Sequence, residues 1–288
     1  MAQNDPFATP ELTTFYGGAI PSGPDQRDYL LPHLALRGAS ARINHDLRSY
    51  HGQSLMVPIA DQGQVGSCTG WAWGRVRAAA SARYHIDRGE APDIGDTLSA
   101  RFIYDLERAH IDGSYPTDAG SQMRSGGEIL RHYGVAPERY CPYTGKADNG
   151  PIEHSITPEA YEAAKSYGVT TFYRLEGSGE RLLDSILGCL DEGWPVVAAI
   201  LVAPSFEQVG PTGRVPSPKA TERVLGGHAV TFCGNYMDTA FEGGLALVGV
   251  NQWGEHWGDH GYFYLPASYA TTQAGQYGPW LQECWTLR

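Results

Sequence analysis

The sequence predicts an α+β protein with a helix-rich first half and a strand-rich second half. Stretches with helical spacing of apolar residues lie between residues 69 and 193, and alternating or continuously apolar runs follow from residue 195. The chain also contains 36 glycines and 19 prolines, which favour a loop-rich protein over a helical bundle. Because 288 residues is close to the length at which one core divides into two, we expect two subdomains with a cleft between them.

Each expected helix has a physical reason. The first follows Cys68, is rich in alanine and is closed by Gly89. Polar residues of the 96–99 segment can cap the second. The third contains Gly126 and Gly127, whose small size indicates close packing, and the fourth is amphipathic. The helices are expected at residues 69–89, 98–110, 121–133 and 181–193, and the strands at 195–202, 226–235, 244–250 and 260–265.

The composition excludes several classes of protein. A hydrophobic content of 42% with 18% charged residues argues against disorder, and a formal net charge of −11 argues against a nucleic-acid partner. No run approaches the roughly 18–20 consecutive apolar residues that span a bilayer, and the N-terminus lacks the features of a signal peptide. We therefore expect a soluble monomer without a membrane partner, either cytoplasmic or exported by a route that the sequence does not reveal.

The cysteines do not form a recognisable disulfide framework. Their number is odd and their spacing is scattered, so we expect reduced thiols. The chain has no C-x-x-C spacing, which argues against zinc, and no metal or organic cofactor is expected. The five are Cys68, Cys141, Cys189, Cys233 and Cys284.

One cysteine stands in a chemically special place. The run PIADQGQVGSCTGWAW, residues 58–73, puts Cys68 after a glycine-rich turn and directly before the first expected helix. The positive end of a helix dipole and the free N–H groups of its first turn favour an anion, so we expect an accessible thiolate near neutral pH. Cys68 is therefore a candidate nucleophile, the alternative being a small buried hydrophobe.

Later segments supply partners for such a nucleophile. His228 begins an apolar run in VLGGHAVTFCGNY, and Asn251 ends another in ALVGVNQWGEHWGDHGYFYL. A base can take the thiol proton, and a neutral amide can fix the imidazole tautomer. Gln62 can point its side-chain N–H₂ to an oxyanion beside the Cys68 N–H. Singly, His228 could be a hydrogen-bonded core residue and Asn251 a turn former, but together the ordered blocks predict a catalytic set.

These blocks resemble those of the papain-like cysteine peptidases, in the form found in bacteria. DQGQVGSC resembles the family's cysteine block, GGHAV its histidine strand, and NQWGEHWGDHGY its asparagine block. The resemblance covers roughly residues 44–288. It implies a helical N-terminal half and a β-barrel-like C-terminal half with the active-site cleft between them. It also implies Cys68 as nucleophile, His228 as general base and then acid, Asn251 as its orienter and Gln62 as oxyanion donor.

The resemblance further implies residues that border the substrate. DAGSQMRSGGEILRHYG resembles the substrate-groove loop and the helix after it, so Gly120 and Ser121 are expected to bind substrate. Trp253 is expected to do so as well, and to shield the hydrogen bond between Asn251 and His228 from water.

The chain departs from the family pattern at several positions. Val65 stands where a cysteine is often bridged to the groove loop, Thr69 replaces a Trp, and Gln252 replaces a Ser. The separation of 160 residues between Cys68 and His228 exceeds the usual value of roughly 130–150. An insertion of surface structure is therefore expected within residues 146–168, which are rich in turn formers.

Residues 1–43 form an N-terminal extension ahead of the peptidase domain at 44–288, with four prolines from Pro6 to Pro24. One interpretation is an ordered strap on the surface or a loose terminus. The other is a propeptide-like segment that runs through the cleft and restrains activity, since extended proline-containing backbone suits a groove.

The sequence thus predicts a cysteine endopeptidase that acts on protein or peptide substrates. The Cys68 thiolate, paired with protonated His228, would attack the scissile carbonyl, and water would hydrolyse the resulting thioester. A pair of this kind would be active from weakly acidic to neutral pH. Two alternatives stay open: a peptide- or ligand-binding protein with little turnover on the same fold, and a transpeptidase that uses the same acyl-enzyme.

Overall fold

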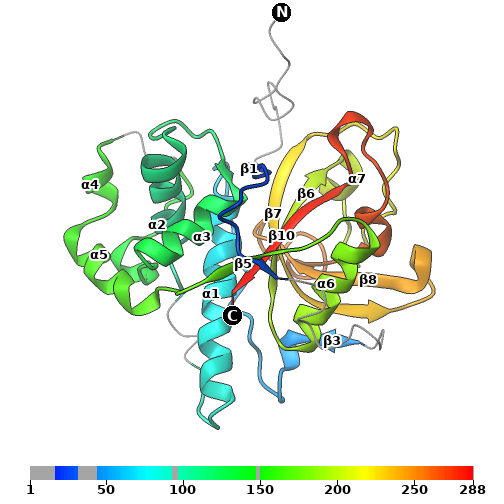
Figure 1. Ribbon diagram of the computed structural model, residues 1–288, viewed down its shortest axis with the longest axis horizontal. Coiled ribbons are helices and arrows are strands. Elements are labelled where there is room, and N and C mark those ends of the chain that lie inside the picture. Colours follow the sequence, from blue (N-terminus) through cyan, green and yellow to red (C-terminus); the bar gives the residue numbers. More distant parts are fainter. Residues whose placement is uncertain (1–16, 32–43, 93–96, 147–149, 288) are drawn as a thin grey trace, which may run out of the picture.

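A helical half and a sheet half lie on either side of one long helix, α1 (Cys68–Ile86) (Figure 1). The structure is a computed structural model and describes residues 17–31, 44–92, 97–146 and 150–287. The helical half comprises α2 (Ala100–Leu106), a π-helical turn (Glu107–Asp112), α3 (Met123–His132), α4 (Ile152–Ser155) and α5 (Pro158–Ala164). The sheet half carries α6 (Glu180–Asp191) and α7 (Pro204–Glu207).

All four expected helices are confirmed, with two differences in the helical half. The hydroxyl of Ser99 accepts a hydrogen bond from the backbone N–H of Phe102 at 3.0 Å and caps α2, as predicted. After Leu106 the helix widens into the π-helical turn, which buries both Glu107 and Arg108. The third helix begins two residues later than expected, because Ser121 and Gln122 form strand β4.

The second half is built on one mixed sheet. Its strands, in spatial order, are β2 (Leu30–Leu31), β5 (Phe172–Leu175), β10 (Leu281–Leu287), β6 (Val196–Val202), β7 (Gly226–Met237), β8 (Leu245–Val250) and β9 (Tyr262–Pro266), and β3 (His45–Asp46) also pairs with β7. The four predicted strands correspond to β6, β7, β8 and β9. The predicted strands did not include β5 or β10, nor the short strands β2, β3 and β4.

Both faces of this sheet are covered, because its central strands alternate between two apolar cores. In β6, Val197 and Ala199 face the core of the helical half, whereas Val196, Ala198 and Ile200 face the core of the sheet half. The helix α1 likewise contributes side chains to both cores. Burial against both halves explains why α1 is alanine-rich: small side chains let the sheet and the neighbouring helices approach it closely.

The polar segment expected to form surface structure is partly integrated into the core. The hydroxyl of Thr157 accepts from the N–H of Ala160 at 3.3 Å and caps α5. Ala160 and Ala164 of this helix are fully buried in the core of the helical half. The segment is therefore surface structure that one face of α5 anchors in the core of the helical half, as far as its described residues show.

The described part of the N-terminal extension crosses from one half to the other. Residues 17–31, called the strap below, pair with β4 through strand β1 (Ala19–Ile20) and with β5 through β2. Both pairings are parallel. In Figure 1 the strap lies across the molecule at the junction of the helices with the sheet. The expectation for residues 1–16 and 32–43 falls outside the described residues.

Candidate active site

Cys68 lies at the first position of α1, and its sulfur is covered. Its exposed fraction is 0%, and the backbone N–H of Gly18 in the strap points at Sγ with an N···S distance of 3.3 Å. Burial raises the pKa of the thiol to about 11, although backbone N–H groups of Ala229 and Gly18 oppose the shift. The expectation of an accessible thiolate near neutral pH is therefore wrong for this state. Desolvation by the strap and core outweighs the helix N-terminus.

His228 and Asn251 form a buried hydrogen-bonded pair. His228 lies on β7 and Asn251 directly follows β8, the neighbouring antiparallel strand. The Nε2 atom of His228 and Oδ1 of Asn251 are 2.8 Å apart, and Oδ1 also accepts from the N–H of Gln252 at 2.9 Å. The Asn251 oxygen thus favours the imidazole tautomer with hydrogen on Nε2. Burial lowers the pKa of His228 to about 4, which keeps the ring neutral at pH 7.

The indole of Trp253 stacks on this imidazole. The ring centroids are 4.7 Å apart with an interplanar angle of 30°. Trp253 itself packs edge-on against Phe206 and Trp257, at 5.7 and 5.2 Å. The indole and its aromatic neighbours form an apolar wall beside the imidazole and the asparagine.

The strand that carries His228 packs against the helix that carries Cys68. The backbone N–H of Ala229, the residue after His228, lies close enough to the Cys68 thiol to lower its pKa. Cys68 and Ala229 belong to the same apolar core, and Thr231 of β7 donates to the carbonyl of Ala72 in α1 at 3.4 Å. Residues 160 positions apart in the chain are therefore brought together at the N-terminus of α1.

Gln62 is fixed between the turn before Cys68 and the segment after Asn251. It is fully buried, and its backbone N–H donates to the carbonyl of Gln252 at 2.8 Å. Its side-chain Nε2 donates to the carbonyl of Val65 at 2.7 Å. A carboxamide nitrogen carries two hydrogens, so this bond is compatible with donation to a second acceptor.

The strap occupies the position next to Gly120 and Ser121. The backbone N–H of Ser121 donates to the carbonyl of Gly18 at 2.7 Å. The strap backbone lies so close that a Cβ on Gly18 would be 2.1 Å from the carbonyl oxygen of Gly66. A Cβ on Gly120, whose φ is +76°, would be 2.2 Å from the carbonyl oxygen of Gly18. Only glycine fits at these two positions.

A cluster of charges holds the strap beyond β1, and we call it the latch. The backbone N–H of Ser22 donates to Glu283 of β10 at 2.6 Å. Asp28 accepts from Arg124 of α3 at 2.6 and 2.7 Å and from Arg174 of β5 at 3.4 Å. Burial would raise the pKa of Asp28, but the two guanidinium groups hold it below its usual value. The latch therefore joins the strap to both halves of the protein.

Sequence reasoning missed a buried acid behind the nucleophile. A carboxyl oxygen of Glu107 accepts from the hydroxyl of Thr69 at 2.6 Å, and the residue is fully buried. A Cβ on Gly126 would lie 2.1 Å from the Trp73 ring and 2.7 Å from Glu107, which confirms the close packing expected there. In the sequence, the signals that could have indicated this buried acid were Gly126 and the presence of Thr69 in place of an aromatic residue.

The structure also bears on the expectations about the cysteines and about membrane-spanning segments. All five cysteines are free and buried, as predicted for reduced thiols. Among the described residues, no helix is both long and apolar enough to cross a bilayer.

Comparison with known proteins defines the class. A family model for the papain family cysteine proteases matches residues 43–276, which is most of the chain. The chain therefore belongs to the papain family of cysteine proteases, as its sequence blocks indicated.

Particular relatives agree with this assignment. An uncharacterized peptidase C1-like protein, L477 of Acanthamoeba polyphaga mimivirus, is 31% identical over 276 residues, covering 89% of this chain and 83% of that protein. Xylellain, a cysteine protease from Xylella fastidiosa, has 26% identity and a TM-score of 0.75, covering 94% of this chain and 95% of its own. The procathepsin L 3 of Tenebrio molitor shares the fold at 18% identity, with a TM-score of 0.66 over 91% of this chain and 75% of that one.

Proposed function

We propose that this papain-family protein is a cysteine endopeptidase with Cys68, His228 and Asn251 as its catalytic triad, and that the strap restrains it. The observation that carries the proposal is the 2.8 Å pair of His228 and Asn251, with His228 on a strand that packs against the helix of Cys68 and shares an apolar core with it. This is the arrangement that nucleophile, base and orienting amide require.

In the proposed reaction, His228 takes the proton of the Cys68 thiol, and the thiolate attacks the carbonyl carbon of the scissile bond. The backbone N–H of Cys68 and the side chain of Gln62 donate to the oxyanion. His228 then gives its proton to the leaving amine as the C–N bond breaks. Water, deprotonated by the same imidazole, hydrolyses the thioester and releases the acid product.

The strap keeps this machinery in an unreactive state. With the thiol pKa at about 11 and the imidazole pKa at about 4, both groups are neutral throughout the physiological pH range. Departure of Gly18 would admit water and substrate to the sulfur. The helix N-terminus could then favour the thiolate, and the thiolate could favour the imidazolium. We therefore propose residues 1–43 as a restraining extension and 44–288 as the peptidase domain.

Removing the strap is expected to raise peptidase activity. A truncated chain that begins at Ile43, and the full chain with Gly18→Val, should each cleave a fluorogenic peptide about tenfold faster or more, because the strap, held by several hydrogen bonds of about 1 kcal/mol each, no longer covers the sulfur. Cys68→Ala in both backgrounds is the control and should show no turnover. Equal rates for the full chain, the truncated chain and Gly18→Val at every substrate concentration would contradict the restraint.

The covered sulfur also favours the alternative of a binding protein with little turnover. Labelling distinguishes the two: a thiolate-selective reagent should modify Cys68 of the truncated chain at pH 5–6 if the thiolate–imidazolium pair forms. An unreactive Cys68 together with tight peptide binding would favour the binding protein. The transpeptidase alternative differs only in the accepting nucleophile.

The role of Gln62 is tested in the truncated chain. Gln62→Ala should lower kcat on the order of 10²–10³-fold, as loss of one oxyanion donor does in a serine protease. Steady-state kinetics with the same peptide measures the effect. A loss below about tenfold would assign the second donor to another group.

A further inference from the structure

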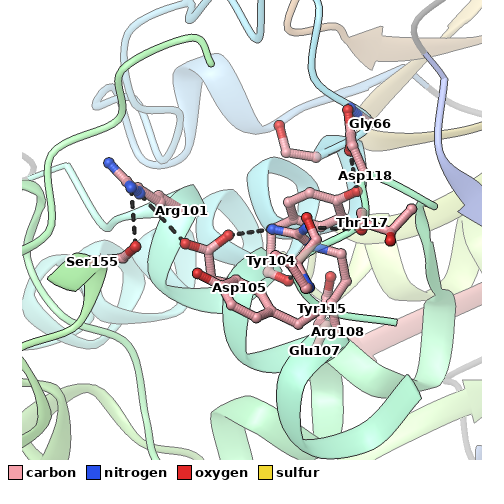
Figure 2. A network of polar contacts seen from close by, with 12 residues as sticks. Gly66, Arg101, Tyr104, Asp105, Glu107, Arg108, Tyr115, Thr117, Asp118 and Ser155 are labelled. Atoms are coloured by element: carbon pink, nitrogen blue, oxygen red, sulfur yellow. Dashed lines mark hydrogen bonds and ion pairs between the residues drawn. The ribbon is translucent and has the colours of Figure 1, made fainter. Parts of the chain in front are cut away.

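The turn before Cys68 and the loop before β4 are joined by a short chain of hydrogen bonds. Both carboxylate oxygens of Asp118 accept from the backbone N–H of Gly66, at 3.1 and 3.2 Å. The hydroxyl of Tyr104 donates to the same carboxylate and accepts from the N–H of Gly120 at 3.1 Å. Figure 2 shows Asp118 between Gly66 and the Tyr104 ring. Gly66 and Gly120 lie 54 residues apart in sequence but share these two side chains.

The loop that carries Asp118 has a rigid base. Arg108 of the π-helical turn is fully buried and donates to the carbonyls of Pro116 and Thr117, at 3.2 and 2.9 Å. Its guanidinium pairs with Asp105 and lies 4.1 Å from the centroid of the Tyr104 ring. Figure 2 shows this arginine below the loop. Because Arg108 is buried, pairs with Asp105 and donates to two carbonyls of the loop, the carboxylate of Asp118 is presented from a fixed position.

The two glycines that this chain of bonds connects are the ones that enclose the strap backbone over Cys68. Gly18 lies between Gly66 and Gly120: a Cβ on Gly18 would be 2.1 Å from the carbonyl oxygen of Gly66, and a Cβ on Gly120 would be 2.2 Å from the carbonyl oxygen of Gly18. The separation of Gly66 and Gly120 therefore sets the width available to any backbone at the nucleophile. A displacement of a few tenths of an ångström would change how that backbone meets the sulfur.

We propose that Asp118 is a positioning residue which, with Tyr104, holds the nucleophile turn and the substrate-binding strand at a fixed separation. The four residues Gly66, Tyr104, Asp118 and Gly120 form what we call the clasp. The proposal rests on the proposed function, since it assigns the site of Gly18 to substrate backbone. Val65 leaves no cysteine for a cross-link beside Gly66, and all five cysteines are free, so a charge-assisted clasp is what joins the two segments here.

The test uses the full chain with Gly18→Val, which displaces the strap. In this background Asp118→Ala should lower kcat by about tenfold or more and change KM by less than about threefold, because Ser121 still binds the substrate backbone while the nucleophile is misplaced. Asp118→Asn keeps one oxygen acceptor, so its kcat should fall between that of Asp118→Ala and that of the Gly18→Val chain with Asp118 intact. The asparagine variant also guards against a folding defect in the alanine variant. Unchanged kcat and KM in Asp118→Ala would overturn the proposal.

Tyr104→Phe has a matched control in the other half of the protein. The hydroxyl of Tyr264 donates to Asp259 at 2.6 Å, a tyrosine–aspartate pair without contact to the nucleophile turn. Tyr264→Phe should leave kcat within about twofold, whereas Tyr104→Phe should lower it by roughly three- to tenfold. Equal effects of the two substitutions would mean that the clasp is only structural.

Hydrogen exchange separates failure of the clasp from failure of the proposed function. The amide of Gly66 should exchange faster in Asp118→Ala than in the unaltered full chain, whereas Tyr264→Phe leaves it unchanged. If Gly18→Val shows no turnover, the proposed function fails and the exchange of Gly66 alone decides on the clasp. Unchanged exchange at Gly66 would contradict the clasp whatever the activity.

Discussion

Glu107 illustrates how a single buried residue can couple the nucleophile helix to pH. Its carboxyl faces Thr69 of α1, Asp112 and Arg108 of the π-helical turn, and Ser121 of β4. Burial raises the pKa of Glu107 to about 8, and the hydrogen bond from Thr69 opposes this only in part. The acid is therefore largely protonated near neutral pH, and its ionisation at higher pH would place a negative charge near Cys68.

The pH dependence of stability follows from the sign of this shift. A carboxyl whose pKa is raised in the folded state stabilises the protein fully below its unfolded pKa of about 4.5, and the contribution is lost as pH rises through about 8. Glu107→Gln removes this titration. Its melting temperature relative to the unaltered protein should therefore rise between pH 5 and pH 9, as measured by thermal unfolding in a buffer series.

The exposed Glu162 provides the control for this measurement. Its side chain is 74% exposed and pairs only with Lys165, one turn away, among the described residues. Glu162→Gln should change the melting temperature by a small, constant amount across the same range. A constant difference between Glu107→Gln and the unaltered protein would show that Glu107 does not titrate differently on folding.

At this scale the residues of the candidate site could be predicted, but not their charge state. Cys68, His228 and Asn251 stand in short blocks whose chemistry is readable locally, and the structure brings two of them into a hydrogen bond at 2.8 Å. The coverage of the sulfur depends on Gly18, 50 residues upstream. No local pattern encodes such a contact, and so the expected thiolate was wrong for this state.

At the scale of elements, the strap and latch decide how firmly the sulfur is covered. The two acidic side chains of the latch, Asp28 and Glu283, are each only 3% exposed, and Arg174 reaches both, with an N···O distance of 3.1 Å to Glu283. Burial raises the pKa of Glu283, while the N–H of Ser22 and Arg174 oppose the shift. Removal of one charged side chain should weaken the latch strongly, because its partners would stay buried without an opposite charge to compensate them.

Asp28→Asn in the full chain is expected to raise peptidase activity about tenfold or more. Loss of charged hydrogen bonds to Arg124 and Arg174 should weaken closure by about 1.5–3 kcal/mol. Asp25→Asn is the matched control, since Asp25 pairs with Arg27 inside the strap and Arg27 is 87% exposed. Its effect should stay within about twofold. If both variants cleave the peptide at the same rate as the unaltered chain, the latch does not govern closure.

The elements that could be predicted are those with a clear period, such as α6 and β6. Strand β10 was missed because its sequence LQECWTL contains Gln and Glu, and the buried Glu283 belongs to the latch rather than to an apolar face. Strand β4 was missed because two residues carry no periodicity, and its partner β1 lies about 100 residues earlier. The π-helical turn buries Glu107 and Arg108 together, which an amphipathic pattern does not reveal.

At the scale of the whole molecule, the two halves share elements rather than meeting at a simple interface. The helix α1 and the strands β6 and β10 each contribute to both apolar cores. The chain length predicted two subdomains, and the order of helices before strands placed Cys68 in one and His228 in the other. The contribution of single elements to both cores was not predictable. The sequence of an alanine-rich helix or of a continuously apolar strand does not indicate whether one or two of its faces are covered.

Shared elements should make the two halves unfold together. Trp285 of β10 is fully buried, lies 5.6 Å from the Phe172 ring, and has the guanidinium groups of Arg124 and Arg174 at 5.7 and 5.6 Å from its centroid. Trp285→Ala should lower the free energy of unfolding by about 3–5 kcal/mol, the usual cost of a large aromatic truncation in a core. The helical signal in far-ultraviolet circular dichroism and the tryptophan fluorescence should shift to lower temperature by the same amount. Two separated transitions in the variant, with the fluorescence change preceding the loss of helix, would mean that the cores are independent and that α1 does not couple them.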